Sequence, residues 1–250
     1  MMRKTVATAI WVLGAAGGAA SCLAADALPG GKDSLPMSSP HRIDLGFFDI
    51  HVCNWSDRPM FFMALFSTTR FDEIAKVEVL DADGRALGEL DLGKYRINKA
   101  PGKPEKRVFI SQIPVPQGAK DGWYSARVTD RAGKQSVARD FVVLAPLPIV
   151  TGAQPKPDAD DIPLPKELRW NAAAGAKHYQ VFIQDLWDGE KLIYTSPLLD
   201  EPRVRLPEGL LKPGGMYAWR VHARDVNEHE LLGDFNHGSL GPPMKFSVAP

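Results

Sequence analysis

The amino-acid sequence predicts an all-β protein made of two tandem β-sandwiches that follow an export signal and a flexible leader. Short strand patterns recur along the chain with turn signals between them, and helical periodicity is weak. One sandwich domain has ~100 residues, so the 250-residue chain has room for two. Hydrophobic residues make up 44% of the chain, which is enough apolar material for two cores.

The N-terminus predicts a secretory signal peptide over residues 1–24. Arg3 and Lys4 form a short basic start, and an uncharged segment centred on Ile10-Trp11-Val12-Leu13 follows. Glycines interrupt this segment and small residues end it, which favours cleavage over a retained membrane anchor. We therefore expect an exported protein of the bacterial type, located in the periplasm or associated with the outer membrane.

Two processing routes remain open. A cut ahead of Ala25 has small residues at the two positions that signal peptidase requires. Alternatively, Ala19-Ala20-Ser21-Cys22 resembles a bacterial lipobox, in which Cys22 is lipidated and becomes the new N-terminus. Lipidated Cys22 is then the only membrane contact that we expect. Both routes leave Cys53 without an intrachain partner, so no structural disulfide is expected.

Two polar stretches divide the rest of the chain. Residues 25–40 are rich in Pro, Gly and Ser and cannot bury enough apolar surface to order themselves, so they predict a flexible leader. Residues 149–165 carry prolines among aspartates and predict a linker or an extended lead-in strand. The predicted sandwiches are therefore residues 41–148 and 166–250.

Within the first sandwich the predicted strands are Ile43 to Val52, Met60 to Ser67, Ala75 to Leu80, Ala86 to Leu92, Arg107 to Ile113, Trp123 to Thr129 and Ser136 to Leu144. Within the second they are Leu168 to Trp170, His178 to Gln184, Lys191 to Thr195, Arg203 to Leu206, Met216 to Arg224 and Met244 to Val248. Turns such as Asp81-Ala82-Asp83-Gly84 place Gly where a hairpin requires positive φ.

The segment Leu211-Lys212-Pro213-Gly214-Gly215-Met216-Tyr217 resembles the corner of a fibronectin type III domain. In that corner the Tyr hydroxyl returns to a backbone group a few residues upstream and fixes the connection between the sheets. Trp170, Tyr179 and Trp219 complete the resemblance. Gly122-Trp123-Tyr124 repeats the pattern about one domain earlier, and with Pro114 and Pro116 it resembles bacterial immunoglobulin-like repeats. The resemblance implies adhesion, docking or spacing roles.

Known catalytic and metal-binding patterns each fail at a named position. Zinc proteases carry a second His four residues after the first, but Gly233 stands four residues after His229. We find neither a nucleophile elbow nor a phosphate-binding glycine loop. A formal net charge of zero argues against nucleic acid. We therefore expect no enzyme, no cofactor and no metal.

Candidate partner-binding residues come from three places. Phe47-Phe48 and Phe61-Phe62 are adjacent aromatic pairs, and since neighbouring strand residues point to opposite faces, one member of each faces away from its own core. A long segment from Asp225 to Pro243 separates the last two predicted strands, and Trp187 lies at a predicted hairpin tip. The predicted partner residues are Phe48, Phe61, Phe62, Trp187, Leu231, Leu232 and Phe235.

Two hypotheses follow. The first is a noncatalytic protein-docking or structural module of the bacterial cell envelope, whose partner is another envelope protein. The alternative is an accessory module that binds a polysaccharide or peptidoglycan through Trp187 and neighbouring aromatic side chains. Neither the partner nor the oligomeric state follows from the sequence.

Overall fold

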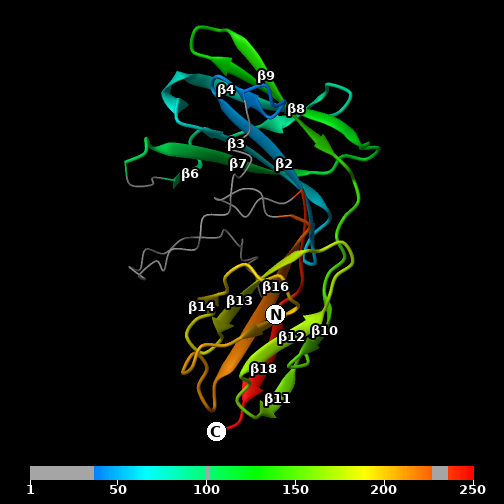
Figure 1. Ribbon diagram of the computed structural model, residues 1–250, viewed down its shortest axis with the longest axis vertical. Coiled ribbons are helices and arrows are strands. Elements are labelled where there is room, and N and C mark those ends of the chain that lie inside the picture. The colour runs from blue at the N-terminus through cyan, green and yellow to red at the C-terminus, as the bar shows by residue number, and fades with distance from the viewer. Residues whose placement is uncertain (1–36, 99–101, 227–235) are drawn as a thin grey trace, which may run out of the picture.

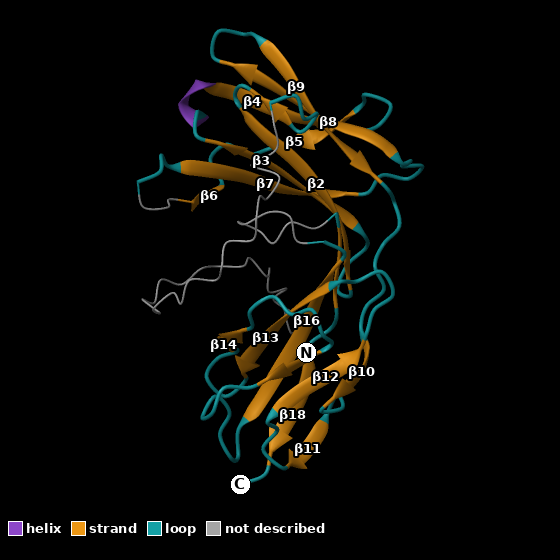
Figure 2. Cartoon of the chain, in the orientation of Figure 1, coloured by secondary structure: helices purple, strands orange, loops and turns teal. Residues whose placement is uncertain are grey.

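The computed structural model describes residues 37–98, 102–226 and 236–250. Regular structure in these residues is almost entirely β, apart from the 3₁₀ turn η2 (Phe71–Glu73). Two β-sandwiches follow each other along the long axis (Figures 1 and 2), which confirms the predicted fold class. No helix among the described residues is long and apolar enough to cross a membrane.

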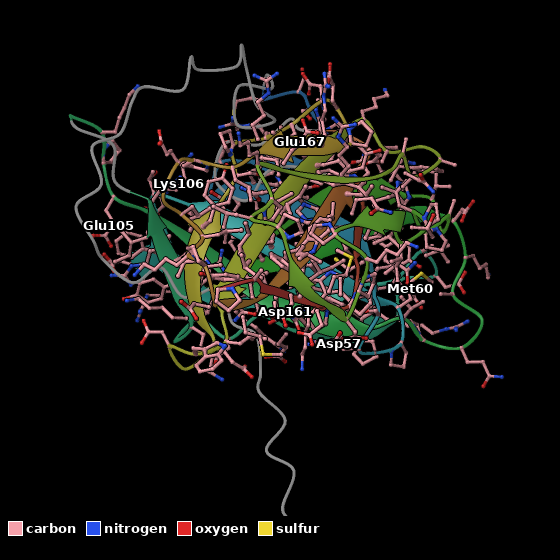
Figure 3. All side chains as sticks on the ribbon, turned by 90° about the horizontal axis from the view of Figure 1, so that it is seen from below. Asp57, Met60, Glu105, Lys106, Asp161 and Glu167 are labelled. Atoms are coloured by element: carbon pink, nitrogen blue, oxygen red, sulfur yellow. The ribbon has the colours of Figure 1, made fainter. Side chains whose placement is uncertain are left out.

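The first sandwich packs two antiparallel sheets face to face. One sheet contains β2 (Gly46–Trp55), β3 (Phe61–Thr68), β7 (Lys106–Pro114) and β6 (Tyr95–Asn98), in that order, with the short β1 (Arg42–Ile43) beside β2. The other has the order β5 (Ala86–Glu89), β4 (Ile74–Leu80), β8 (Gly122–Asp130) and β9 (Gln135–Val142). Strand β7 begins at Lys106, and Met60 lies beside its other end, where it accepts the Val115 N–H. These two residues lie on opposite sides of the molecule in Figure 3.

Every second side chain along these strands points inward, and together these side chains form the core between the two sheets. Phe48 of β2, Phe62 of β3 and Tyr124 of β8 are fully buried there. The Tyr124 hydroxyl donates a hydrogen bond to the Lys120 carbonyl oxygen at 3.0 Å, so this large ring brings its polar atom to a partner at the core boundary.

The second sandwich packs a three-stranded sheet against a larger one. The small sheet has the order β10 (Thr151–Gln154), β12 (Glu167–Asn171) and β15 (Arg203–Arg205). The larger sheet contains β11 (Ala159–Ile162), β18 (Met244–Val248), β16 (Met216–Arg224), β13 (His178–Asp185) and β14 (Lys191–Thr195). Strands β10 and β11 lie in the stretch where the sequence left open a linker or a lead-in strand.

A tyrosine corner closes the second core. The Lys212 backbone N–H donates to the Tyr217 hydroxyl oxygen at 2.8 Å, as the sequence predicts for this segment. Trp170 packs against Tyr179 and Trp219, with ring centroids 5.5 and 6.1 Å apart. Cys53 is free and buried. Burial raises the pKa of its thiol.

Strand β17 (His237–Leu240) joins the two sandwiches into one sheet. It pairs antiparallel with the end of β16 and parallel with β2 of the first sandwich. Strand β18 pairs with the beginning of β16. The result is a continuous sheet of eleven strands through both domains. The sequence predicted a long excursion here, but did not predict that part of it forms a strand.

We expect that Tyr217→Phe lowers the free energy of unfolding by about 1–2 kcal/mol, because it leaves the Lys212 N–H without its acceptor. Urea unfolding followed by fluorescence measures this change. Tyr194→Phe is the matched control, because no described residue shares a hydrogen bond with the Tyr194 hydroxyl; it should change stability by less than about 0.5 kcal/mol. Equal losses in both variants would argue that the corner hydrogen bond contributes nothing.

Candidate functional site

Three predicted partner residues, Phe48, Phe61 and Phe62, are buried, so the expectation that these side chains meet a partner is wrong. Phe48 and Phe62 lie in the core between the sheets, and both have 0% exposure. Phe61 lies on the opposite face, as the alternation predicts, but there it packs with Trp55 and is covered by Leu240 of β17 and by the Arg58 guanidinium. The chain itself therefore covers these rings.

Trp187 is the predicted partner residue that the described part of the chain exposes, at 76%. It lies in the turn between β13 and β14, where its backbone N–H donates to the Asp185 carboxylate at 2.9 Å. Gly189 and Glu190 close the turn with φ of 64° and 60°. The remaining predictions, Leu231, Leu232, Phe235 and the lipidation of Cys22, lie outside the described residues and stay predictions.

An exposed apolar surface that the sequence analysis missed lies on the outer side of β8 and β9. We call it the β8–β9 face, and it consists of Trp123, Val137, Arg139, Phe141 and Val143. The four apolar side chains are 47%, 44%, 50% and 40% exposed, respectively. Trp123 and Phe141 are directly opposed across the two strands, and their rings lie 5.4 Å apart at 78°.

A sequence signal for this face was available. In β9 the alternate residues Ala138 and Val142 are buried in the core, while Val137 and Phe141 between them are also apolar. A strand with apolar residues on both faces must have a second cover or a second partner. The reasoning is the one that failed for Phe48, Phe61 and Phe62. Here it identifies side chains that stay exposed in the described part of the chain.

The two guanidinium groups on this sheet differ in their ion pairs. The Glu78 carboxylate of β4 accepts hydrogen bonds from Lys76 Nζ at 2.9 Å and from Arg127 Nε at 3.0 Å. These two hydrogen bonds lower the pKa of the Glu78 carboxyl group. Arg139 is exposed and forms no ion pair with any residue that the structure describes. The β8–β9 face therefore combines apolar side chains with one uncompensated cation.

The free edge of β9 is partly closed. The Arg139 backbone N–H donates to the Pro40 carbonyl oxygen at 2.7 Å. One residue on, the Asp140 carboxylate accepts the Ile50 N–H of β2 at 3.0 Å. A partner strand therefore cannot pair with β9 at the Arg139 N–H, which Pro40 already accepts.

Side chains fix the junction around β17. Asn54 Nδ2 donates to the Leu147 carbonyl at 2.9 Å, and Ser239 Oγ donates to the Pro148 carbonyl at 2.8 Å. Both carbonyls belong to the segment that connects the sandwiches. Arg220 Nε donates to the Gly241 carbonyl at 2.8 Å on the other side of β17. These bonds hold the connecting segment and β17 against one another.

His237 occupies the start of β17 between two acceptors. Its Nδ1 lies 2.7 Å from the Asp225 carboxylate, and its Nε2 lies 2.6 Å from the Val143 carbonyl oxygen. Only the protonated imidazole donates from both nitrogens. The hydrogen bond with Asp225 raises the pKa of His237 against the effect of burial, and the Asp121 carboxylate adds to the rise. Burial is the largest single effect and would raise the pKa of Asp225, but the side-chain and backbone hydrogen bonds from His237, its charge and the Asn236 N–H together lower it.

One group of described residues has the chemistry of metal ligands. His41, Asp49 and Asp140 place their ligand atoms within 4.8 Å of one another. However, the Asp49 carboxylate lies 3.0 Å from His51 Nε2, and both carboxylates accept the Ile50 N–H. Their described contacts are those of a buried hydrogen-bond network between the two sheets.

Two open grooves lie on the second sandwich. They lie beside β12, and their linings include Lys166, Glu167 and Arg205. Neither lining contains His, Cys or Ser, and the ionisable residues in the linings are Lys, Glu and Arg.

The chain matches no protein-family model and no curated protein. Among solved structures it is similar to latent PorU from Porphyromonas gingivalis, with 16% identity, 81% of this chain and 20% of the other covered, and a TM-score of 0.27. It is also similar to SGBP-B of the mixed-linkage glucan utilization locus of Bacteroides ovatus, with 11% identity, 80% of this chain and 44% of the other covered, and a TM-score of 0.24. A third similar structure is titin domains A168–A170, with 15% identity, 77% of this chain and 60% of the other covered, and a TM-score of 0.25. The chain thus spans less than half of the first two, and similarities at this level carry no argument about function.

We expect the junction to weaken as the pH rises above about 6.5 and through the raised pKa of His237. The folded pKa of His237 is raised, so its contribution is fully present below the unfolded value of about 6.5 and is lost as the pH rises through the folded pKa. Hydrogen exchange of the β17 amides reports this change. His237→Gln should remove that part of the pH dependence, whereas His178→Gln, which alters a His–Asp pair on the second sandwich, should keep it. A wild-type pH profile in His237→Gln would contradict the assignment.

Proposed function

We propose that this chain is a noncatalytic docking module of the bacterial cell envelope that binds another envelope protein through the β8–β9 face. The observation that carries the proposal is the grouping of four exposed large apolar side chains on one side of a rigid sheet. Single exposed apolar residues are normal, but a contiguous group of them marks an interaction site.

Ring geometry favours a protein over a sugar at this face. Carbohydrates stack on the open face of an aromatic ring, and two rings form a continuous platform only when they are nearly coplanar. Trp123 and Phe141 are instead perpendicular, at 78°. Perpendicular rings form a ridge with adjoining hollows, which suits the interdigitating side chains of a protein interface.

The envelope location and the domain families are part of the proposal. Export is supported by the signal-peptide pattern of residues 1–24, and attachment by the lipobox-like Cys22. The fibronectin type III character of the second sandwich is supported by the Tyr217 corner and by its two packed sheets. The immunoglobulin-like character of the first is supported by its two packed antiparallel sheets and the Tyr124 bond.

Photo-crosslinking in the native envelope tests the docking proposal. A benzophenone amino acid placed at Phe141 should form a discrete protein adduct, identifiable by mass spectrometry. The matched control position is Ile97 of β6, which is also exposed and apolar, at 56%, but lies on the other sheet. We expect no adduct from Ile97, and loss of the Phe141 adduct when Trp123 is replaced by Ala. Equal adduct patterns from both positions would contradict the proposal.

A second candidate is polysaccharide binding through Trp187. Its indole is exposed at a hairpin tip beside Asp185 and Asp188, so an open ring face and carboxylate acceptors for sugar hydroxyls lie together. We expect retention on immobilised peptidoglycan or glucan to be lost in Trp187→Ala and kept in Trp123→Ala. Affinity electrophoresis measures both. Retention that is unchanged in Trp187→Ala, or no retention of the wild type, removes this candidate.

A further inference from the structure

We infer that the surface that binds the β8–β9 face is an apolar protein segment with a carboxylate that pairs with Arg139. This inference rests on the proposed docking function and specifies its partner. It follows from the position of Arg139, from the charges around it and from the unfavourable burial of an unpaired charge.

Arg139 lies in the middle of the apolar group. It stands between Val137 and Phe141 on the same side of β9, and successive residues on one side of a strand are ~7 Å apart. Across the strands it faces Ser125 of β8, next to Trp123. A partner that covers the aromatic rings and Val137 must therefore also cover the Arg139 side chain.

Covering Arg139 is favourable only if the partner supplies a negative charge. Arg127, the other guanidinium on this sheet, already has Glu78 at 3.0 Å. Arg139 has no ion pair with a described residue, and a guanidinium removed from water without a counter-charge is strongly unfavourable. A carboxylate forms two parallel hydrogen bonds with a guanidinium, so it both compensates the charge and orients the partner.

The same charge argues against a second copy of this chain. If two copies packed through their β8–β9 faces, the two Arg139 side chains would meet near the centre of the contact, and like charges repel there. Pairing through the β9 edge is obstructed because Pro40 already accepts the Arg139 N–H. The favoured occupant is therefore a different protein whose apolar surface carries an acidic residue.

Two extended peptides with the sequences Leu-Asp-Leu and Leu-Lys-Leu at their centres test this pairing on the purified full chain. The reporter is the indole N–H signal of Trp123, assigned by comparison with Trp123→Phe. We expect the Asp peptide to shift this signal and to bind at least about tenfold more tightly than the Lys peptide. Arg139→Glu should reverse this order.

Arg205→Glu is the matched control, because Arg205 is also exposed and lies on the second sandwich. It should leave the order of the peptides unchanged. Both variants should keep the wild-type melting temperature, since both side chains point to solvent. The inference is overturned if the two peptides bind equally or if Arg139→Glu has no effect.

Other occupants give distinct results. If the Phe141 crosslink persists while Arg139→Glu changes nothing, the docking proposal stands and the carboxylate inference fails. If the Phe141 crosslink is absent, the docking proposal itself fails. Concentration-dependent dimerisation that Trp123→Ala abolishes would identify a second copy as the occupant. Sedimentation with phosphatidylglycerol vesicles that depends on Trp123 would identify a membrane, and either result would overturn the inference.

Discussion

The backbone hydrogen bonds on the two edges of β17 are the interaction on which the arrangement of this molecule depends. One edge pairs with the end of β16 and the other with β2, so neither sandwich presents an open edge at the junction. Backbone hydrogen bonds specify direction and register, and side-chain contacts alone do not. Asn54 and Ser239 then attach the connecting segment to the same strand. The two domains are thereby held as one continuous sheet instead of two units on a linker (Figure 1).

This junction also explains which aromatic residues are accessible. Strand β17 brings Leu240 over Phe61 and Trp55, so a surface that is apolar in the isolated first sandwich becomes interior in the whole chain. The β8–β9 face belongs to the other sheet, whose strands do not pair with β17, although His237 of β17 bonds to the backbone carbonyl of Val143. Its apolar side chains therefore stay exposed. A strand with apolar residues on both faces thus has two different outcomes in one domain, and the position of β17 decides between them.

Binding is the function that this architecture suits. The described strands place the β8–β9 face and the Trp187 hairpin on regular sheets, which hold surface side chains in fixed positions and reduce the ordering that a partner must impose. The buried polar groups found at the junction and in the first sandwich, such as Asp225 with His237 and Asp49 with His51, are engaged with each other and with the backbone. They stabilise the scaffold, and the exposed residues remain available for the proposed docking.

The sequence by itself determined the fold class, most of the strands and the corner at Tyr217, because alternation, turn residues and the upstream hydrogen bond of a tyrosine are all local in the chain. It also identified Trp187 as a hairpin-tip residue. Only the tertiary structure decided the fate of Phe48, Phe61 and Phe62, the role of β17 and the exposure of Trp123 and Phe141. Alternation shows that a residue lies on one side of a strand or the other, whereas the burial of that side depends on what packs against it from far along the chain.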